Sequence, residues 1–178
     1  MPSVVAMDTG QLLQEVLGRA RALVPSVVDG MEEGELSRAP QPGANPVAWL
    51  VWHQARVLDD HVADAAGLEQ VWTATTGGGP SWADRFALDL PREDTGYGHE
   101  PEQVSRVRAS AELLSGYAGA VGARVDEVVA QLSPEDLDRV VDDAWDPPVT
   151  YGVRLASVAS DCLQHLGQAA YVRGLLGR

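Results

Sequence analysis

Four long segments of this chain carry apolar residues at alternating intervals of three and four positions. The pattern is most regular between residues 101 and 132. Such spacing places the apolar side chains on one face of an α-helix, and that face must be buried against other helices. The apolar residues between 101 and 132 that follow this spacing are Val104, Val107, Ala111, Leu114, Ala118, Val121, Val125, Val128 and Leu132. We therefore predict an all-α protein, a four-helix bundle.

Capping and helix-breaking residues predict the bounds of the first two helices. The first is expected over residues 9–31, where Pro25 should kink or divide it. The second is expected over 46–66. An Asn-Pro pair at 45–46 is typical of a helix start, and Gly67 is typical of a helix end.

The second half of the chain supplies the other two helices. The third is expected over residues 100–132 without a break, and the fourth over 150–176. Short helices are predicted over 81–88 and 133–141, and no strand is predicted. The long crossover 68–100, which joins the second and third helices, argues against a simple up-down-up-down bundle and is typical of a functional segment.

Length and composition predict one soluble domain over residues 1–178. A formal charge of −13 and a pI of about 4.5 argue against nucleic acid and against a basic membrane-surface module. No apolar run approaches the length of a membrane span. One cysteine excludes an internal disulfide framework, and no signal peptide is evident. We expect a cytoplasmic protein with no nucleic-acid or membrane partner.

A histidine within the apolar stripe of the fourth helix indicates where chemistry could take place. The stripe contains His165, and Asp161 lies four residues earlier, so both side chains can reach one metal ion. His53 lies mid-way along the second helix on its inward side. Three ligands from two helices would leave open coordination positions, as catalytic metals require. The alternative is that both histidines are hydrogen-bonded core residues and Asp161 is a solvated flank.

Three segments resemble the DinB/YfiT-like metalloenzyme superfamily. They are NPVAWLVWHQARVLDDHVADAAG, DTGYGHEPEQVSRVRA and DCLQHLGQAAYVRGLL, and the resemblance extends over nearly the whole chain. More narrowly, they resemble the actinobacterial DinB-like or mycothiol transferase branch. The absence of lysine among 13 basic residues is compatible with such a host. The resemblance implies a four-helix bundle with a long crossover between helices 2 and 3.

The resemblance also implies a divalent metal held by His53, Asp161 and His165. Many members have histidine where this chain has Asp161. The carboxylate is similar to the variant in mycothiol-dependent maleylpyruvate isomerase. Zinc is the expected metal, with nickel or iron as alternatives. Characterised relatives use a low-molecular-weight thiol such as mycothiol, whose pKa an open metal site can lower.

Four further residues are candidates for the site, each with a plainer alternative. Arg154 lies on nearly the same side of its helix as His165, and it could bind a carboxylate on a substrate or thiol. Arg56 and His99 are predicted to contact substrate, and Asp60 to support a metal-bound histidine. For Arg154 the alternative is a surface ion pair, and for Arg56 and Asp60 it is a solvated helix face. For the segment around His99 the alternative is that it only forms a turn. The identity of any catalytic residue stays open.

Three functional hypotheses follow. The first is a metal-dependent thiol S-transferase or isomerase that acts on a small electrophile. The second is a non-catalytic, stress-related bundle that binds metal or a small molecule. The third is a non-haem iron enzyme, since two histidines and one carboxylate also form the facial triad of iron oxygenases. Metal identity separates the third from the first. A homodimer is expected by analogy with related bundles.

Overall fold

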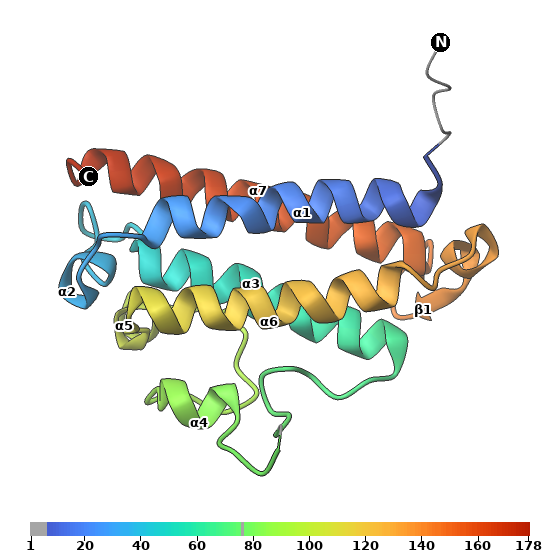
Figure 1. The fold of residues 1–178 in the computed structure, drawn as a ribbon, viewed down its shortest axis with the longest axis horizontal. Helices are drawn as coiled ribbons and strands as arrows, with labels where there is room; N and C mark the ends of the chain where they lie inside the picture. The colour runs from blue at the N-terminus through green and yellow to red at the C-terminus, as the bar shows by residue number, and fades with distance from the viewer. Residues whose placement is uncertain (1–6, 76) are drawn as a thin grey trace.

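The computed structural model describes residues 7–75 and 77–178 and confirms the predicted all-α bundle. Four long helices form it: α1 (Thr9–Val28), α3 (Val47–Ala66), α6 (Ala111–Val129) and α7 (Tyr151–Leu175) (Figure 1). Their apolar faces meet in one core, whose largest fully buried side chains include Trp52, Tyr117 and Tyr151.

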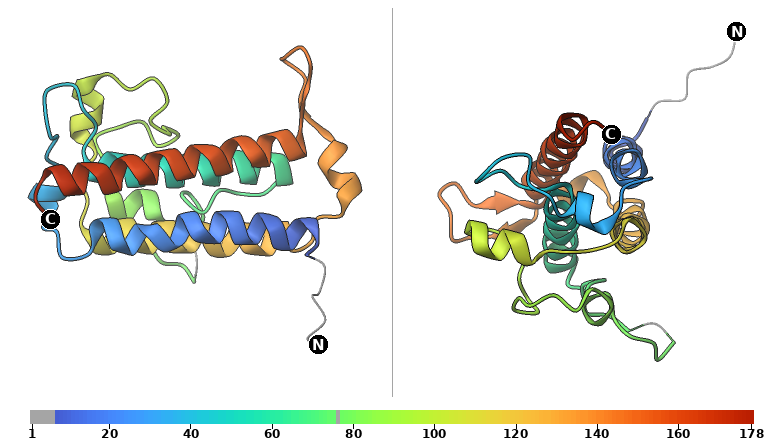
Figure 2. Two further views of the ribbon diagram at one scale, coloured as in Figure 1. Left: turned by 90° about the horizontal axis from the view of Figure 1, so that it is seen from above. Right: turned by 90° about the vertical axis from the view of Figure 1, so that its left-hand side faces the viewer.

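Each long helix packs against two others. α3 contacts α7 and α6, and α1 contacts the same two helices from the opposite side of the bundle. The crossover leads the chain back along the bundle, so that α6 runs in the same direction as α3, while α1 and α7 run the other way (Figures 1 and 2). The bundle is therefore not a simple up-down-up-down arrangement, in agreement with the prediction from the crossover.

The start of α3 differs from the prediction, because Pro46 and not Asn45 is the cap residue and no side chain caps this end. Other helix ends show the capping that the residue types favour. Gly67 ends α3 in the left-handed conformation, with φ of 65°. The Thr150 side chain caps α7 by accepting a hydrogen bond from Val153 N. Pro25 does not divide the first helix, which continues through it to Val28. Because Pro25 lies in the last turn, the backbone bond that it cannot donate is one of the last in α1.

The predicted third helix is wrong as a single element. The structure divides it into α5 (Pro101–Arg106) and α6, because Val107 leaves the helical conformation and Ser110 caps a new helix through a bond from Leu113 N. Val107 and Ala109 are nevertheless buried. The apolar spacing therefore continues across the break, since the connecting loop also turns its apolar side chains into the core.

The prediction that the chain has no strand is also wrong. β1 (Val140–Asp142) and β2 (Val149–Thr150) form a small antiparallel hairpin before α7. The segment predicted as a helix over 133–141 contains only a short 3₁₀ helix, η1 (Pro134–Asp138), capped by Ser133. The strands have too few residues to show an alternating pattern in the sequence.

Two further short helices flank the bundle. α2 (Glu33–Leu36) lies in the connection between α1 and α3. α4 (Trp82–Phe86) lies in the crossover and begins at Ser81, as predicted, because the Ser81 hydroxyl accepts a hydrogen bond from Asp84 N.

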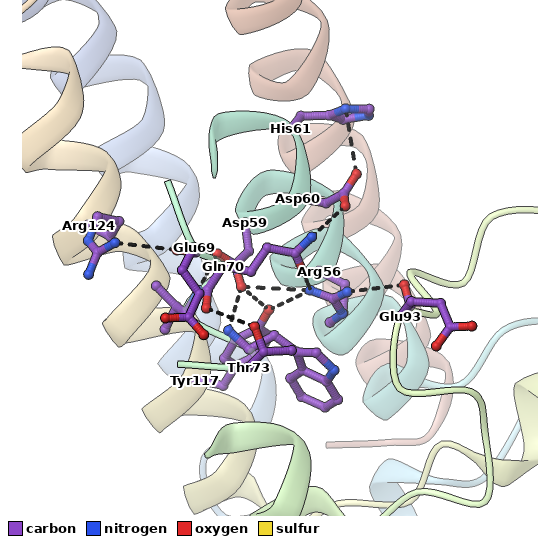
Figure 3. A network of polar contacts seen from close by, with 12 residues as sticks. Arg56, Asp59, Asp60, His61, Glu69, Gln70, Thr73, Glu93, Tyr117 and Arg124 are labelled. Atoms are coloured by element: carbon purple, nitrogen blue, oxygen red, sulfur yellow. Dashed lines mark hydrogen bonds and ion pairs between the residues drawn. The ribbon is translucent and has the colours of Figure 1, made fainter. Parts of the chain in front are cut away.

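A buried carboxylate on α3 anchors the start of the crossover (Figure 3). Asp59 Oδ1 accepts a hydrogen bond from Val71 N, and Oδ2 accepts bonds from Trp72 N and from the Tyr117 hydroxyl. Arg56 NH1 lies 3.7 Å from the same carboxylate. One side chain thus joins α3, α6 and the crossover. Buried polar groups of this kind stabilise a fold only when all partners are present.

Replacement of Asp59 by Asn should destabilise the protein strongly. One carboxylate oxygen becomes an N–H donor that faces other donors, so the free energy of unfolding should fall by about 2–4 kcal/mol. Urea unfolding measures this change. The same substitution at Asp89, whose side chain is 94% exposed, is the matched control and should leave stability unchanged. Equal stabilities for the two variants would contradict the anchoring role.

Candidate metal centre

His53 is held on α3 with one ring nitrogen occupied and the other free. Its Nδ1 lies 2.6 Å from the Thr95 carbonyl oxygen. Because a carbonyl only accepts, Nδ1 carries the proton and Nε2 is left with its lone pair. The side chain is almost fully buried, and this burial lowers the pKa of His53. The neutral form, which metals bind, is therefore favoured.

The other two predicted ligands face each other on α7. His165 Nε2 lies 3.4 Å from Asp161 Oδ1, and His165 Nδ1 lies 3.0 Å from Gln168 Oε1. Since Nδ1 donates to the Gln168 oxygen, a neutral His165 would direct the Nε2 lone pair at a carboxylate. A proton or a metal cation between them removes that repulsion.

The electrostatics of this pair show the same preference for a positive charge. The hydrogen bond with Asp161 raises the pKa of His165. Burial alone would raise the pKa of Asp161, but the hydrogen bond and the charge of His165 hold it below its ordinary value. Both shifts favour a positive charge beside Asp161.

The three predicted ligands are brought together, and they fit a divalent metal. One donor atom from each of His53, Asp161 and His165 lies within 4.8 Å of the others. Asp161 Oδ2 is buried and has no hydrogen-bond partner among the described residues. A buried carboxylate oxygen without a donor is costly, and a cation would satisfy it. Two imidazoles and one carboxylate suit zinc, nickel or iron.

A cavity of about 570 Å³ opens beside these donors. His53 and Asp161 form part of its wall, together with Thr95 of the crossover and residues of α7. The β1–β2 hairpin closes one side with Trp145, and Tyr97 extends from the crossover on the rim. Both aromatic side chains are largely exposed, at 67% and 92%.

Two of the other predicted site residues line this cavity. Arg154 NH2 donates to Asp142 Oδ2 at 3.0 Å, and Arg154 NH1 lies 2.8 Å from His61 Nδ1. Asp60 also lines the cavity, but its Oδ1 accepts a bond from Gln70. The expectation that Asp60 supports a metal-bound histidine is not met for His53, because the Thr95 carbonyl holds the ring instead.

The structure corrects the expectation that Arg56 and His99 contact substrate. Arg56 is completely buried, and its guanidinium bonds Gln70, Tyr117 and the crossover backbone. The His99 side chain is 2% exposed and bonds Trp49 and Asp94. Neither residue lines the cavity beside the metal donors.

The single cysteine plays no visible part in the chemistry. Cys162 is fully buried next to Asp161, and its thiol lies 3.9 Å from the Gln54 carbonyl oxygen. Burial raises the pKa of this thiol to about 12. It packs as a small hydrophobic residue, as expected from the sequence.

Comparison with known proteins identifies the family. A sequence model of the DinB superfamily matches residues 17–169. The chain belongs to the DinB superfamily. Members of this superfamily often bind a divalent metal, and the donors of His53, Asp161 and His165 form a candidate site for one in this chain.

One solved structure gives a close fold match for this DinB chain. It is the crystal structure of a conserved protein from Enterococcus faecalis, which is 36% identical, with a TM-score of 0.88. The match covers 97% of this chain and all of the other. A search of curated proteins gives no significant match. Within the described residues, no helix combines the length and apolar character needed to cross a membrane.

Replacement of Asp161 by Asn should lower the pKa of His165 in the metal-free protein. The carboxylate stabilises the imidazolium, so its removal leaves burial, which opposes the charged form, against only the smaller effect of the Gln168 hydrogen bond. An NMR titration of the histidine ring nitrogens measures the pKa. Asp142→Asn is the control, because Asp142 bonds Arg154 and not His165. An unchanged His165 pKa in Asp161→Asn would contradict the pairing.

Proposed function

We propose that this DinB protein is a divalent-metal-dependent enzyme, a thiol S-transferase or isomerase that acts on a small electrophilic molecule. One observation carries the proposal: the donors of His53, Asp161 and His165 converge within 4.8 Å beside a cavity of about 570 Å³. That volume lies within the range of small-molecule sites. A structural metal site, in contrast, is usually closed by four protein ligands.

The three protein ligands leave room for a thiol co-substrate of the mycothiol type. A divalent metal bound here would lower the pKa of the thiol and so supply a thiolate nucleophile at neutral pH. The chain itself holds His53 in the neutral, Nε2-accepting form through the Thr95 carbonyl. Zinc is the proposed metal, because it binds nitrogen and oxygen ligands and also accepts sulfur.

Arg154 is the proposed contact for an acidic group on the substrate or thiol. Of the described residues that line the cavity, it alone carries a permanent positive charge. Asp142 and His61 fix its guanidinium from two sides, so little side-chain entropy remains to be lost on binding. Its remaining N–H groups can donate to a carboxylate.

A second candidate function is a non-haem iron enzyme. The observation that favours it is the composition of the donor set, two histidines and one carboxylate with open positions, which is the facial triad of iron oxygenases. The metal that the protein retains on isolation distinguishes the two functions. A site that binds metal but supports no turnover would instead indicate a binding module.

Replacement of His53 by Ala should abolish thiol transfer. With zinc-loaded protein, mycothiol and the fluorogenic electrophile monochlorobimane, we expect conjugation faster than the uncatalysed reaction in the wild type only. The loss should exceed about 100-fold in kcat/KM, because one of three ligands is removed. The fluorescence of the conjugate measures the rate, and Arg106→Gln, at an exposed ion pair remote from the cavity, is the control.

The same assay tests Arg154. Arg154→Gln should slow the reaction of mycothiol with a carboxylate-bearing electrophile more than with neutral monochlorobimane. Equal effects on both electrophiles would count against a carboxylate contact. Wild-type protein that accelerates neither reaction would exclude the transferase function for these substrates.

A further inference from the structure

The imidazole of His53 is held on three sides by groups that do not belong to the metal centre. The Thr95 carbonyl accepts its Nδ1–H. The Trp49 indole stacks on its face, with ring centres 4.4 Å and planes 18° apart. The backbone of Gly96 lies against its edge. Trp49 comes from the preceding turn of α3, whereas Thr95 and Gly96 come from the crossover.

His99 connects the Trp49 indole on α3 to the crossover turn that contacts His53. Trp49 Nε1–H donates to His99 Nδ1 at 3.2 Å. Because an indole nitrogen only donates, His99 Nδ1 is unprotonated and the proton lies on Nε2. That proton is donated to Asp94 Oδ2, at 2.9 Å. His99 therefore connects the stacked indole to the residue that precedes the Thr95 carbonyl.

Arg56 holds the same turn from the other side. Its Nε donates to the Asp94 carbonyl oxygen at 3.0 Å, and its NH2 donates to the Glu93 carbonyl oxygen at 3.4 Å. Figure 3 shows the guanidinium between the crossover near Glu93 and the network around Asp59 and Tyr117. Since Arg56 is fully buried, its five donors require these fixed acceptors.

Gly96 is the point of closest approach between the turn and the ligand. Its φ is +92°, a conformation that other residues rarely adopt. A Cβ there would lie 2.7 Å from His53 Nδ1 and 3.0 Å from the Trp52 ring. The turn can reach the imidazole only because this position has no side chain.

We infer that His99 and Arg56 are positioning residues that fix the rotamer and tautomer of His53 through the turn Asp94–Thr95–Gly96. The inference rests on the metal site of the proposed function. Residues that hold a metal-bound histidine typically change metal affinity by about 10- to 100-fold when they are replaced. The metal affinity of this protein therefore depends on the crossover as well as on the helices that carry the ligands.

The variant His99→Phe tests the inference directly, because it keeps a ring of similar shape and removes both hydrogen bonds. Zinc affinity, measured by competition with a chromophoric chelator, should fall by about 10- to 100-fold. In ¹⁵N NMR of the metal-free protein, the His53 ring should also change from the Nδ1–H tautomer alone to a mixture of the Nδ1–H and Nε2–H tautomers. Val24→Ala is the control: it destabilises the core from α1, which carries no metal donor and no part of the turn, and it should leave zinc affinity unchanged.

A folded His99→Phe protein with wild-type zinc affinity and an unchanged His53 tautomer would overturn the inference. Wild-type protein that binds no zinc would overturn the proposed function instead. The tautomer measurement on metal-free protein would then still decide whether His99 positions His53. A loss of affinity in Val24→Ala equal to that in His99→Phe would also overturn the inference, because general destabilisation would explain both.

A pair of glycine variants provides an independent test. Gly96→Ala and Gly98→Ala both place a Cβ at a positive φ, of 92° and 72°, but only the first Cβ meets His53. Gly96→Ala should weaken zinc binding by at least about 10-fold more than Gly98→Ala. Equal zinc affinities in the two variants would contradict the contact between the turn and the ligand.

Discussion

The buried guanidinium of Arg56 is the constraint on which the crossover depends. A charge removed from water is tolerated only where an opposite charge and fixed acceptors surround it. Here Asp59 supplies the charge, and Gln70, Tyr117 and the backbone at residues 93–94 supply the acceptors. These acceptors come from both ends of the long connection and from α6. The crossover is therefore held against the bundle at its start and near its end.

The metal centre follows from this arrangement together with the packing of α3 against α7. The helices bring His53 opposite Asp161 and His165, and the crossover then selects which nitrogen of His53 is free. Within the described part of the chain one oxygen of Asp161 has no hydrogen-bond partner, and together with the facing nitrogen of His165 it leaves a place for a cation. The hairpin and the crossover shape the cavity beside it, so the bundle supplies the ligands and the loops shape the space for substrate.

The sequence alone predicted the parts of this structure that depend on local periodicity. The apolar stripes located the long helices, and the four-residue spacing of Asp161 and His165 located two of the ligands. The break at 107–110 was missed because buried loop residues continued the stripe, although Ser110 is a capping residue. The roles of Arg56 and His99 were missed because their partners lie on a turn about 40 residues from Arg56 and 50 residues separate His99 from Trp49. The apolar periodicity of a helix describes only neighbouring residues and carries no information on such long-range contacts.

The metal content of untagged protein tests the central claim most directly. Elemental mass spectrometry of the wild type beside His165→Ala should show about one divalent ion per chain in the former and a loss in the latter, because metal binding requires all three ligands. Zinc or nickel would agree with thiol chemistry, and iron would favour the oxygenase alternative. No metal in either protein, even after incubation with zinc, would contradict the account and leave a helical bundle in which His53 and His165 have only structural contacts.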